Sequence, residues 1–293
     1  MSDNTVRLSH LGSPTRVPCC IYGTAEKKDA KPIIAALAAG YRGLDSACQP
    51  QYYDESIVGE ALQVAFAPPS EGGLGLTRSD IYLQTKFTTP AGHTTTTSPY
   101  LPGDSTKVKV LKSLEMSLSR LKVSFVDTLL LHGPMPTLEE TLNVWRAMES
   151  CVGEMTRNLG ICNVTIELLQ TVYAQAKIPL SIVQNRFWRQ SSYDRDLREY
   201  CQRHGITYQA FWILKANPDL LGSKLVGWLA ERTVTSREDC LFALVLSLGS
   251  PNSGVCVLNG TKSSQRMEGT LRAITRLGTI PEFIREGFLD ELR

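Results

Sequence analysis

The feature that most constrains the fold of this chain is a regular alternation of short apolar runs with longer amphipathic segments. The apolar runs are continuous rather than alternating, as expected of strands that are buried on both faces. Residues 126–132 (VDTLLLH) are typical of them. Strands are predicted at residues 17–23, 42–46, 81–86, 126–132, 157–162, 181–185, 206–211 and 254–258.

The segments between the strands have the spacing of amphipathic helices. In residues 105–123, for example, Val108, Leu111 and Leu114 share one stripe. Thr137 followed three residues later by Glu140 predicts a capping box at a helix start. Helices are predicted at residues 28–41, 54–66, 105–123, 137–152, 165–176, 193–205 and 236–249.

Alternating strands and helices predict an α/β fold with a parallel sheet, and about eight units in one chain fit a single-domain (β/α)8 TIM barrel. The competing doubly wound sheet needs a Gly-rich turn after its first strand. Residues 21–28 (IYGTAEKK) hold one glycine and no GxGxxG motif, so the barrel is favoured. We expect it to span residues 1–293, with an N-terminal segment at 1–16 and a C-terminal helix at about 281–293.

Two stretches without helical periodicity are predicted to be loops. Residues 87–104 are rich in Thr, Pro and Gly, and residues 67–80 form a second Gly-containing stretch. The longer stretch follows a predicted strand, so we expect it to help build the substrate pocket of a barrel.

Composition narrows the class of protein and its partners. The chain has 293 residues, is 42% hydrophobic and carries a formal net charge of +2, which is too small to argue for nucleic acid as the natural partner. It shows no signal peptide and no apolar run that would cross a membrane. The eight cysteines include no CxxC pair, and no metal-ligand spacing is present. We therefore expect a cytoplasmic protein with free thiols, a monomer or weak homo-oligomer, that acts on a small molecule.

Polar side chains end three successive predicted strands. Asp45, Lys86 and His132 each follow an apolar run. Catalytic groups of such barrels lie where strands end, and neighbouring strands are about 4.8 Å apart. These three side chains are therefore expected to converge, with Asp45 and Lys86 paired.

Five motifs in this order and spacing resemble the aldo-keto reductases. The likeness runs from about Pro18 to Glu268. It implies a (β/α)8 barrel that binds NADPH without a Rossmann domain and reduces a carbonyl group, here in a fungal-looking branch with a role in secondary metabolism. The motifs are GYRGLDSACQPQYYDESIVGEAL, LQTKF, LLLHGP, LGICNV and VQNRF.

The resemblance also implies a catalytic tetrad of Asp45, a tyrosine, Lys86 and His132. The usual tyrosine lies five residues after the aspartate, where this chain has Pro50. Tyr52 and Tyr53 are both candidates, and the fungal-looking branch favours Tyr53 as the acid, with Tyr52 in the substrate pocket.

The chemistry of carbonyl reduction explains why this set of side chains is useful. A free tyrosine has a pKa of about 10, which is high for an acid at neutral pH. The Lys86 ammonium is expected to lower the pKa of the tyrosine, while Asp45 holds the lysine. His132 is expected to donate a hydrogen bond to the carbonyl oxygen.

The cofactor residues are likewise implied by the resemblance. The usual serine before Asn163 is Cys162 here, and Phe211 stands where a tyrosine usually stacks on the nicotinamide. Asn163 and Gln184 match the residues that contact the carboxamide. The full expected set is Gly23, Thr24, Asp45, Cys162, Asn163, Gln184, Phe211, Trp212, Lys262 and Arg266.

The phosphate end of the cofactor site departs from the family pattern IPKS. This chain has VLNGTKSSQRMEG, so Asn259 or Gly260 occupies the usual lysine position. Lys262 and Arg266 remain as phosphate partners near an expected helix start, which favours NADPH over NADH. Trp188 is expected to line the substrate pocket.

Two other functions fit the same sequence. The altered phosphate motif, Cys162 and the displaced tyrosine also suit a barrel enzyme that isomerises, dehydrates or cyclises a polyketide-like substrate without net redox chemistry. In that case Tyr53 and His132 would act as acid–base groups. The third reading is a non-catalytic subunit that only senses the cofactor.

Overall fold

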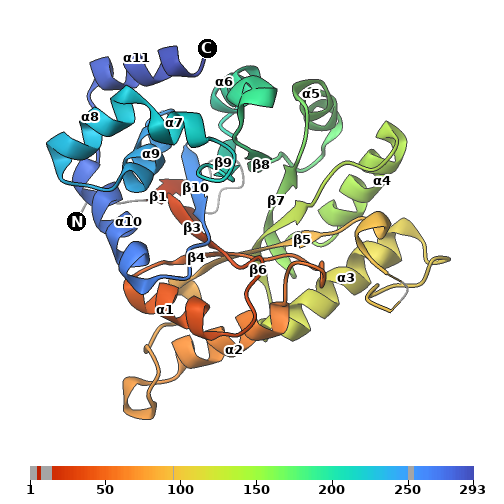
Figure 1. Ribbon diagram of the computed structural model, residues 1–293. Helices are drawn as coiled ribbons and strands as arrows, with labels where there is room; N and C mark the ends of the chain where they lie inside the picture. The colour runs from red at the N-terminus through yellow and green to blue at the C-terminus, as the bar shows by residue number, and fades with distance from the viewer. Residues whose placement is uncertain (1–4, 8–14, 95, 250–253) are drawn as a thin grey trace.

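Eight parallel strands close into a barrel in a computed structural model that describes residues 5–7, 15–94, 96–249 and 254–293 (Figure 1). The strands follow one another around the barrel in chain order, and the last pairs with the first. The predicted (β/α)8 barrel is thus confirmed, and each predicted strand overlaps an observed one. The strands are β3 (Cys20–Gly23), β4 (Gly43–Asp45), β5 (Tyr82–Phe87), β6 (Val126–Leu131), β7 (Thr156–Cys162), β8 (Ile182–Arg186), β9 (Thr207–Phe211) and β10 (Val255–Asn259).

Helices surround the strands (Figure 1). The predicted capping box exists, because Thr137 Oγ1 accepts from the Glu140 amide at 3.2 Å and the Glu140 carboxylate accepts from the Thr137 amide at 3.1 Å. The helices are α1 (Lys31–Ala39), α2 (Glu55–Phe66), α3 (Thr106–Leu121), α4 (Leu138–Glu149), α5 (Ile166–Gln175), α6 (Arg195–Arg203), α7 (Pro218–Gly222), α8 (Lys224–Thr233), α9 (Arg237–Leu246), α10 (Ser264–Leu277) and α11 (Glu282–Glu291).

Two helices after β9 were not predicted. The short α7 begins with Pro218 in its first turn, and α8 begins where Ser223 Oγ accepts from the Val226 amide at 3.2 Å. In the chain both lie between β9 and β10. Helix α8 contacts the terminal helix α11, which falls within the expected 281–293 segment.

A small antiparallel hairpin precedes the barrel. It pairs β1 (Thr5–Arg7) with β2 (Arg16–Pro18), and the Val17 side chain is fully buried inside the barrel with Ile21. The hairpin therefore packs into the end of the barrel at which the strands begin. Residues 1–4 and 8–14 of the expected N-terminal segment lie outside the described residues.

The barrel interior holds a layer of glutamines above the apolar cluster that contains Val17 and Ile21. Gln84 Nε2 donates to Asp45 Oδ1 at 2.6 Å and to Gln209 Oε1 at 2.8 Å. Gln184 Nε2 donates to the same two oxygens at 2.9 Å each. The layer lies directly beneath the C-terminal ends of the strands, so it supports whatever stands on that face.

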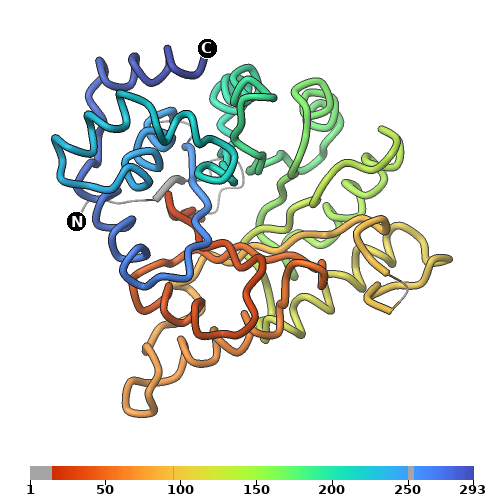
Figure 2. The backbone as a smooth tube through the Cα atoms, viewed as in Figure 1, coloured from red at the N-terminus to blue at the C-terminus, as the bar shows by residue number. Residues whose placement is uncertain are grey.

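The two predicted loops project from the barrel. The segment 67–80 extends at the lower left of Figure 2, and residues 88–94 and 96–105 extend on the right. Each contains short 3₁₀ turns, at Pro69–Glu71 and Arg78–Asp80 in the first and at Pro90–Gly92 in the second. Within the described ranges, no helix combines the length and the hydropathy that a bilayer crossing requires.

Candidate active site

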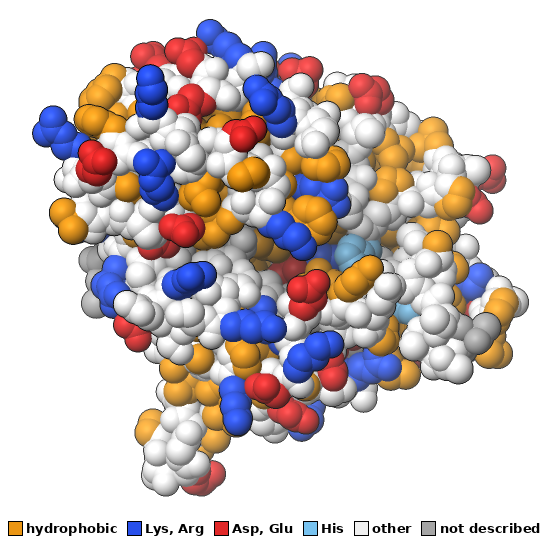
Figure 3. All heavy atoms as spheres, in the orientation of Figure 1, with side chains coloured by type: hydrophobic (Ala, Val, Ile, Leu, Met, Phe, Trp, Pro, Cys, Tyr) orange, Lys and Arg blue, Asp and Glu red, His pale blue; other side chains and the backbone are white. Residues whose placement is uncertain are grey.

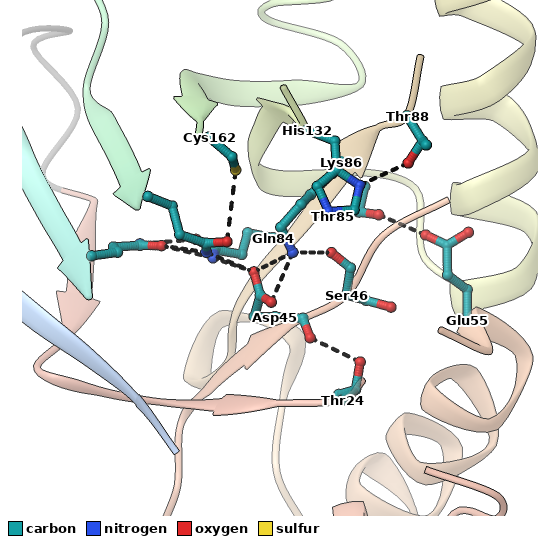
Figure 4. Close-up of polar contacts among 12 residues, drawn as sticks. Thr24, Asp45, Ser46, Glu55, Gln84, Thr85, Lys86, Thr88, His132 and Cys162 are labelled. Atoms are coloured by element: carbon teal, nitrogen blue, oxygen red, sulfur yellow. Dashed lines mark hydrogen bonds and ion pairs between the residues drawn. The ribbon is translucent and has the colours of Figure 1, made fainter. Parts of the chain in front are cut away.

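A buried ion pair forms the base of the site. Lys86 Nζ donates to both carboxylate oxygens of Asp45 and to the Ser46 carbonyl oxygen, at 2.8 Å each (Figure 4). The side chains of Asp45 and Lys86 are only 2% and 1% exposed. Burial alone would lower the pKa of Lys86, but the adjacent carboxylate raises the pKa overall. The lysine is therefore held in its charged form.

The structure brings Tyr53, and not Tyr52, to this ion pair. Lys86 Nζ lies 4.9 Å from the centre of the Tyr53 ring, and the His132 ring lies edge-on to it at 6.0 Å. Tyr52 is 48% exposed, and its hydroxyl accepts a hydrogen bond from the Gln51 side chain. The carboxylate, the ammonium, the imidazole and one phenol thus form a single cluster.

The pKa of Tyr53 is shifted in the direction opposite to the one expected. Burial raises the pKa of its hydroxyl, and the Lys86 ammonium only partly opposes this increase. Desolvation outweighs the lysine charge that was expected to lower this pKa. Tyr53 is consequently protonated at neutral pH, which is the form that an acid catalyst needs.

His132 is held as a neutral ring directly after β6. Burial and the Lys86 charge lower the pKa of His132 to about 3. The ring Nδ1 lies 2.9 Å from the hydroxyl oxygen of Thr88 (Figure 4).

The direction of that hydrogen bond follows from the other neighbours of the Thr88 hydroxyl. Thr88 is 3% exposed, and no second acceptor for its hydroxyl occurs among the described residues. Donation to Nδ1 satisfies both groups, whereas the reverse would leave a buried hydroxyl hydrogen without an acceptor. The proton of the neutral His132 ring is therefore on Nε2, where it can serve as a donor.

Three residues expected at the nicotinamide line the rim around this cluster. Thr24 Oγ1 donates to the Asp45 carbonyl oxygen at 2.8 Å, directly after Gly23 at the end of β3. Asn163 has the left-handed φ of 54° and donates through Nδ2 to the His132 carbonyl oxygen at 2.8 Å. Its side chain is exposed, so its amide oxygen is accessible to a ligand.

Gln184 and Cys162 lie deeper, within the barrel interior. Both amide hydrogens of Gln184 are used within the glutamine layer, and the Cys162 thiol lies 3.6 Å from Gln184 Oε1. Phe211 ends β9 and Trp212 follows it at the rim, with their ring centres 6.2 Å apart, and Trp212 is 43% exposed.

The expected phosphate partners lie at the start of α10. Lys262 and Arg266 are both exposed there, and Ser263 caps the helix through the Arg266 amide. Arg266 also lines a cavity of about 650 Å³ together with Thr261 and Leu214. This cavity, the helix N-terminus and the cations fit the phosphate-bearing half of a dinucleotide.

Lys27 completes this positive cluster and was not found from the sequence. Its side chain is buried, and Nζ donates to the Gly260 carbonyl oxygen at 2.9 Å and to the Ala25 carbonyl oxygen at 3.3 Å. Burial and the nearby Lys262 charge lower the pKa of Lys27 to about 8. The ammonium thus stands beside Gly260, one of the two positions considered for the family lysine.

Gln84, Gln209 and Thr88 are further residues that the sequence reading missed. Gln84 could have been predicted, because every second residue of a strand lies on the same face. Tyr82, Gln84 and Lys86 of β5 therefore all face the barrel interior. Thr88 extends that alternation by one step beyond the strand.

The opening of the site is visible on the surface. Figure 3 shows a hollow near the middle of this face, with a histidine side chain at its edge and both hydrophobic and positively charged side chains around it. Trp188, expected to contact substrate, lies partly buried on the segment after β8. Across the described ranges, no group of three His, Cys, Asp or Glu side chains is arranged to bind a metal ion.

Known proteins resemble this chain in sequence. The model of the aldo/keto reductase family matches residues 22–217. NADPH-dependent codeinone reductase 1-3 from Papaver somniferum is 28% identical over 74% of this chain and 68% of its own length. NAD(P)H-dependent 6'-deoxychalcone synthase from Glycine max is 30% identical over 71% of this chain and 66% of its own.

Solved structures share the fold at lower sequence identity. An aldo/keto reductase from Brucella melitensis superposes with a TM-score of 0.76 at 22% identity, and the match covers 99% of both chains. An aldo-keto reductase from Bombyx mori in complex with NADP gives a TM-score of 0.75 at 19% identity, over 96% of this chain and 92% of that one.

Proposed function

Because the chain belongs to the aldo/keto reductase family, we propose that it is an NADPH-dependent enzyme that reduces the carbonyl group of a small aldehyde or ketone to an alcohol. The observation that carries the proposal is the cluster of Tyr53, Lys86, Asp45 and His132 at the barrel mouth. Relatives named as NADPH-dependent reductases of plant natural products support the cofactor and a place in secondary metabolism.

The proton side of the reaction is performed by this cluster. The Tyr53 hydroxyl gives its proton to the carbonyl oxygen, and the phenolate that forms is stabilised by the Lys86 charge. Asp45 keeps the ammonium in place through both carboxylate oxygens. The Nε2–H group of His132 donates a hydrogen bond to the carbonyl oxygen of the substrate and holds this oxygen near the Tyr53 hydroxyl.

Rim residues would hold the cofactor. A bound reduced nicotinamide supplies the hydride that the carbonyl carbon accepts. Asn163 offers its amide oxygen to the carboxamide, and the Phe211 ring offers a face for stacking. Lys27, Lys262 and Arg266 would neutralise the phosphates, which favours NADPH over NADH.

The cellular setting follows from the cysteines. All eight are free, and seven of them are buried, which supports a reducing compartment such as the cytoplasm. The substrate is a small molecule, because the site is a hollow at the end of a barrel.

Paired tyrosine variants test the proposal. With NADPH and a panel of activated aldehydes, Tyr53→Phe should lower kcat/KM by about 10²-fold or more, because the proton donor is lost. Tyr52→Phe, the matched control in the same loop, should stay within about threefold, as expected of an exposed change. The readout is the loss of NADPH absorbance, with cofactor affinity measured separately by fluorescence quenching.

Two outcomes would contradict the proposal. Full activity in Tyr53→Phe together with loss in Tyr52→Phe would transfer the acid role to Tyr52. Wild-type protein that does not bind NADPH would exclude the reductase and leave non-redox acid–base chemistry by Tyr53 and His132 as the remaining enzyme function.

A further inference from the structure

The structure holds an arginine at the mouth of the barrel that the proposed reaction does not use. Residues 182, 184 and 186 of β8 share one face of the strand. Ile182 lies in the inner apolar cluster, and Gln184 reaches Asp45 across the barrel. Arg186 therefore extends from the same inward face, one level above Gln184, on the side of the catalytic cluster.

Two tryptophans hold the Arg186 guanidinium between them. It lies 4.3 Å from the centre of the Trp188 ring and 4.0 Å from that of Trp212. Contacts with two indoles restrict the side chain and remove part of its hydration. The guanidinium is thus preorganised rather than free to rotate in solvent.

Arg186 has no anionic partner. Among residues 5–7, 15–94, 96–249 and 254–293, its side chain makes no ion pair and no hydrogen bond, and its Nε is buried without an acceptor. Two carboxylates border the same cavity without pairing with Arg186: the exposed Asp196, and Asp194, whose Oδ2 accepts from the Asn185 amide at 2.9 Å and from the Tyr208 hydroxyl at 3.0 Å. A partly desolvated cation without a counter-ion favours the binding of an anion.

A cavity beside the arginine extends to Asn163, which contacts the backbone of His132. It has a volume of about 610 Å³, and its lining includes Arg186, Trp188, Ser191, Arg195 and Asn163. Asn163 also donates to the His132 carbonyl oxygen, so the cavity borders the end of the catalytic strand β6. A ligand in this cavity can present one group to Arg186 and another to the barrel mouth.

We propose that Arg186 is a substrate-binding residue that receives a carboxylate, so that the preferred substrates are carbonyl compounds with a carboxylic acid group. The planar guanidinium can form two parallel hydrogen bonds to a carboxylate, which a lysine cannot. The proposal rests on the reductase function proposed above. The shared chemistry also fits a cofactor phosphate, and the experiment separates the two anions.

Matched acid and ester substrates test it. Wild-type kcat/KM is compared for 2-, 3- and 4-carboxybenzaldehyde, for phenylglyoxylate, and for the methyl ester of each. The acid should be preferred about 10- to 100-fold in at least one pair, as expected for charge-assisted hydrogen bonds. In Arg186→Met this acid-to-ester ratio should fall to about one, and Arg186→Lys should recover only part of it.

Arg189→Met is the matched control, because Arg189 lies three residues away, is 78% exposed and contacts Asp219 at 3.9 Å. It should keep the wild-type ratio. The proposal is overturned if no acid is preferred while esters are reduced, or if the ratio in Arg186→Met is unchanged. It is also overturned if both substrates weaken equally while the Kd for NADPH rises, which would assign Arg186 to the cofactor. If neither acids nor esters are reduced, the reductase function itself fails.

A measurement without turnover covers the case in which Arg186→Met is unstable. Benzoate and benzamide are compared as ligands of the wild-type protein and of Arg186→Lys in the presence of NADP⁺. Tighter binding of benzoate to wild type, reduced in Arg186→Lys, supports the carboxylate site. Equal affinities for benzoate and benzamide contradict it.

Discussion

At the scale of single residues, the site is organised by hydrogen bonds that fix protonation states. Asp45 accepts two glutamine amides and the Lys86 ammonium, so neither the carboxylate nor the lysine has freedom to turn away. The Thr88 hydroxyl holds the His132 ring in place through one hydrogen bond to Nδ1. These contacts decide which atoms can donate to a substrate.

Thr88 is accordingly expected to act as a positioning residue. In Thr88→Val the Nδ1 partner is lost, the ring can carry its proton on either nitrogen, and kcat should fall about tenfold with little change in KM, because one hydrogen bond is affected. Thr88→Ser keeps the hydroxyl and should restore activity. Nitrogen NMR of histidine-labelled protein should show Nε2–H in wild type and Thr88→Ser, and a tautomer mixture in Thr88→Val.

The same spectra give a result that is independent of turnover. An Nδ1–H tautomer in the wild-type protein would show that the hydrogen bond runs from His132 to Thr88. Unchanged spectra in Thr88→Val would show that another contact sets the tautomer.

Lys27 gives the cofactor site a pH dependence. Its pKa is lowered to about 8, so the ammonium is present below that pH and is lost above it. A phosphate ligand favours the charged form, and NADPH affinity should therefore fall as the pH rises. We expect the Kd to increase about three- to tenfold between about pH 7 and 9, where a phosphate monoester is already ionised.

Two lysine variants separate this effect from general pH changes. Lys27→Met should bind NADPH more weakly than wild type at low pH, and its Kd should no longer increase with pH. Lys28→Met changes an exposed neighbour and should keep the increase in Kd. An increase of the same size in Lys27→Met would remove Lys27 from the explanation. Fluorescence titration with NADPH at each pH supplies the measurement.

At the scale of elements, close packing of α2 against α3 determines where the segment between β4 and α2, which carries Tyr53, ends. Glu55, the first residue of α2, accepts a hydrogen bond from Thr85 in β5 at 2.6 Å (Figure 4) and another from Ser117 in α3 at 3.0 Å. One turn later, Gly59 allows the two helices to approach. Together these contacts fix the helix that directly follows Tyr53.

Gly59→Ala should therefore destabilise the protein. A Cβ at this position would lie 2.1 Å from the Arg120 carbonyl oxygen of α3, so the helices must separate. We expect a loss of about 1–3 kcal/mol in the free energy of unfolding by urea titration. Gly222→Ala, at a helical glycine with open space around it, should be neutral or slightly stabilising.

Comparable losses in both glycine variants would point to a backbone effect of alanine rather than to helix contact. Equal stability of Gly59→Ala and wild type would show that α2 can move away from α3 without cost, and the loop before it would then be less rigid than inferred.

The element pattern was largely predictable, whereas the site was predictable only in part. Continuous apolar runs identify strands because both faces of a barrel strand are buried. The helices α7 and α8 were not predicted, because Pro218 and Gly222 interrupt the helical spacing of apolar residues in this short segment. Lys27 could not be found, since its approach to Gly260 joins residues far apart in the sequence.

Burial was the other missing quantity. A sequence shows that Lys86 and a tyrosine are near each other in a barrel, but the desolvation that raises the pKa of Tyr53 depends on everything packed around them. Likewise, the sequence does not show that the ring of Tyr53, and not that of Tyr52, lies beside the lysine.

At the scale of the whole molecule, the half-buried neutral His132 links stability to pH. The folded-state pKa of His132 is about 3, whereas an unfolded histidine titrates near 6.5. Between these values the unfolded chain binds more protons, so this contribution is complete above about pH 6.5 and is lost as the pH falls toward 3.

His132→Asn should reduce the pH dependence of unfolding. From about pH 6.5 to 4, the wild-type free energy of unfolding should fall more steeply than that of the variant, by at most about 1.4 kcal/mol per pH unit. Urea titrations at several pH values measure both slopes. Parallel slopes would mean that the ring is protonated in the folded protein.

The glutamine layer also has a consequence for the barrel as a whole. Neighbouring strands are joined by their backbones, but Gln84 and Gln209 tie β5 to β9, and Gln184 ties β8 to β4, straight across the lumen. Side-chain hydrogen bonds therefore connect strands on opposite sides of the barrel. A substitution at Lys86 is therefore expected to affect β8 and β9 on the opposite side of the barrel, through Asp45 and the glutamine layer.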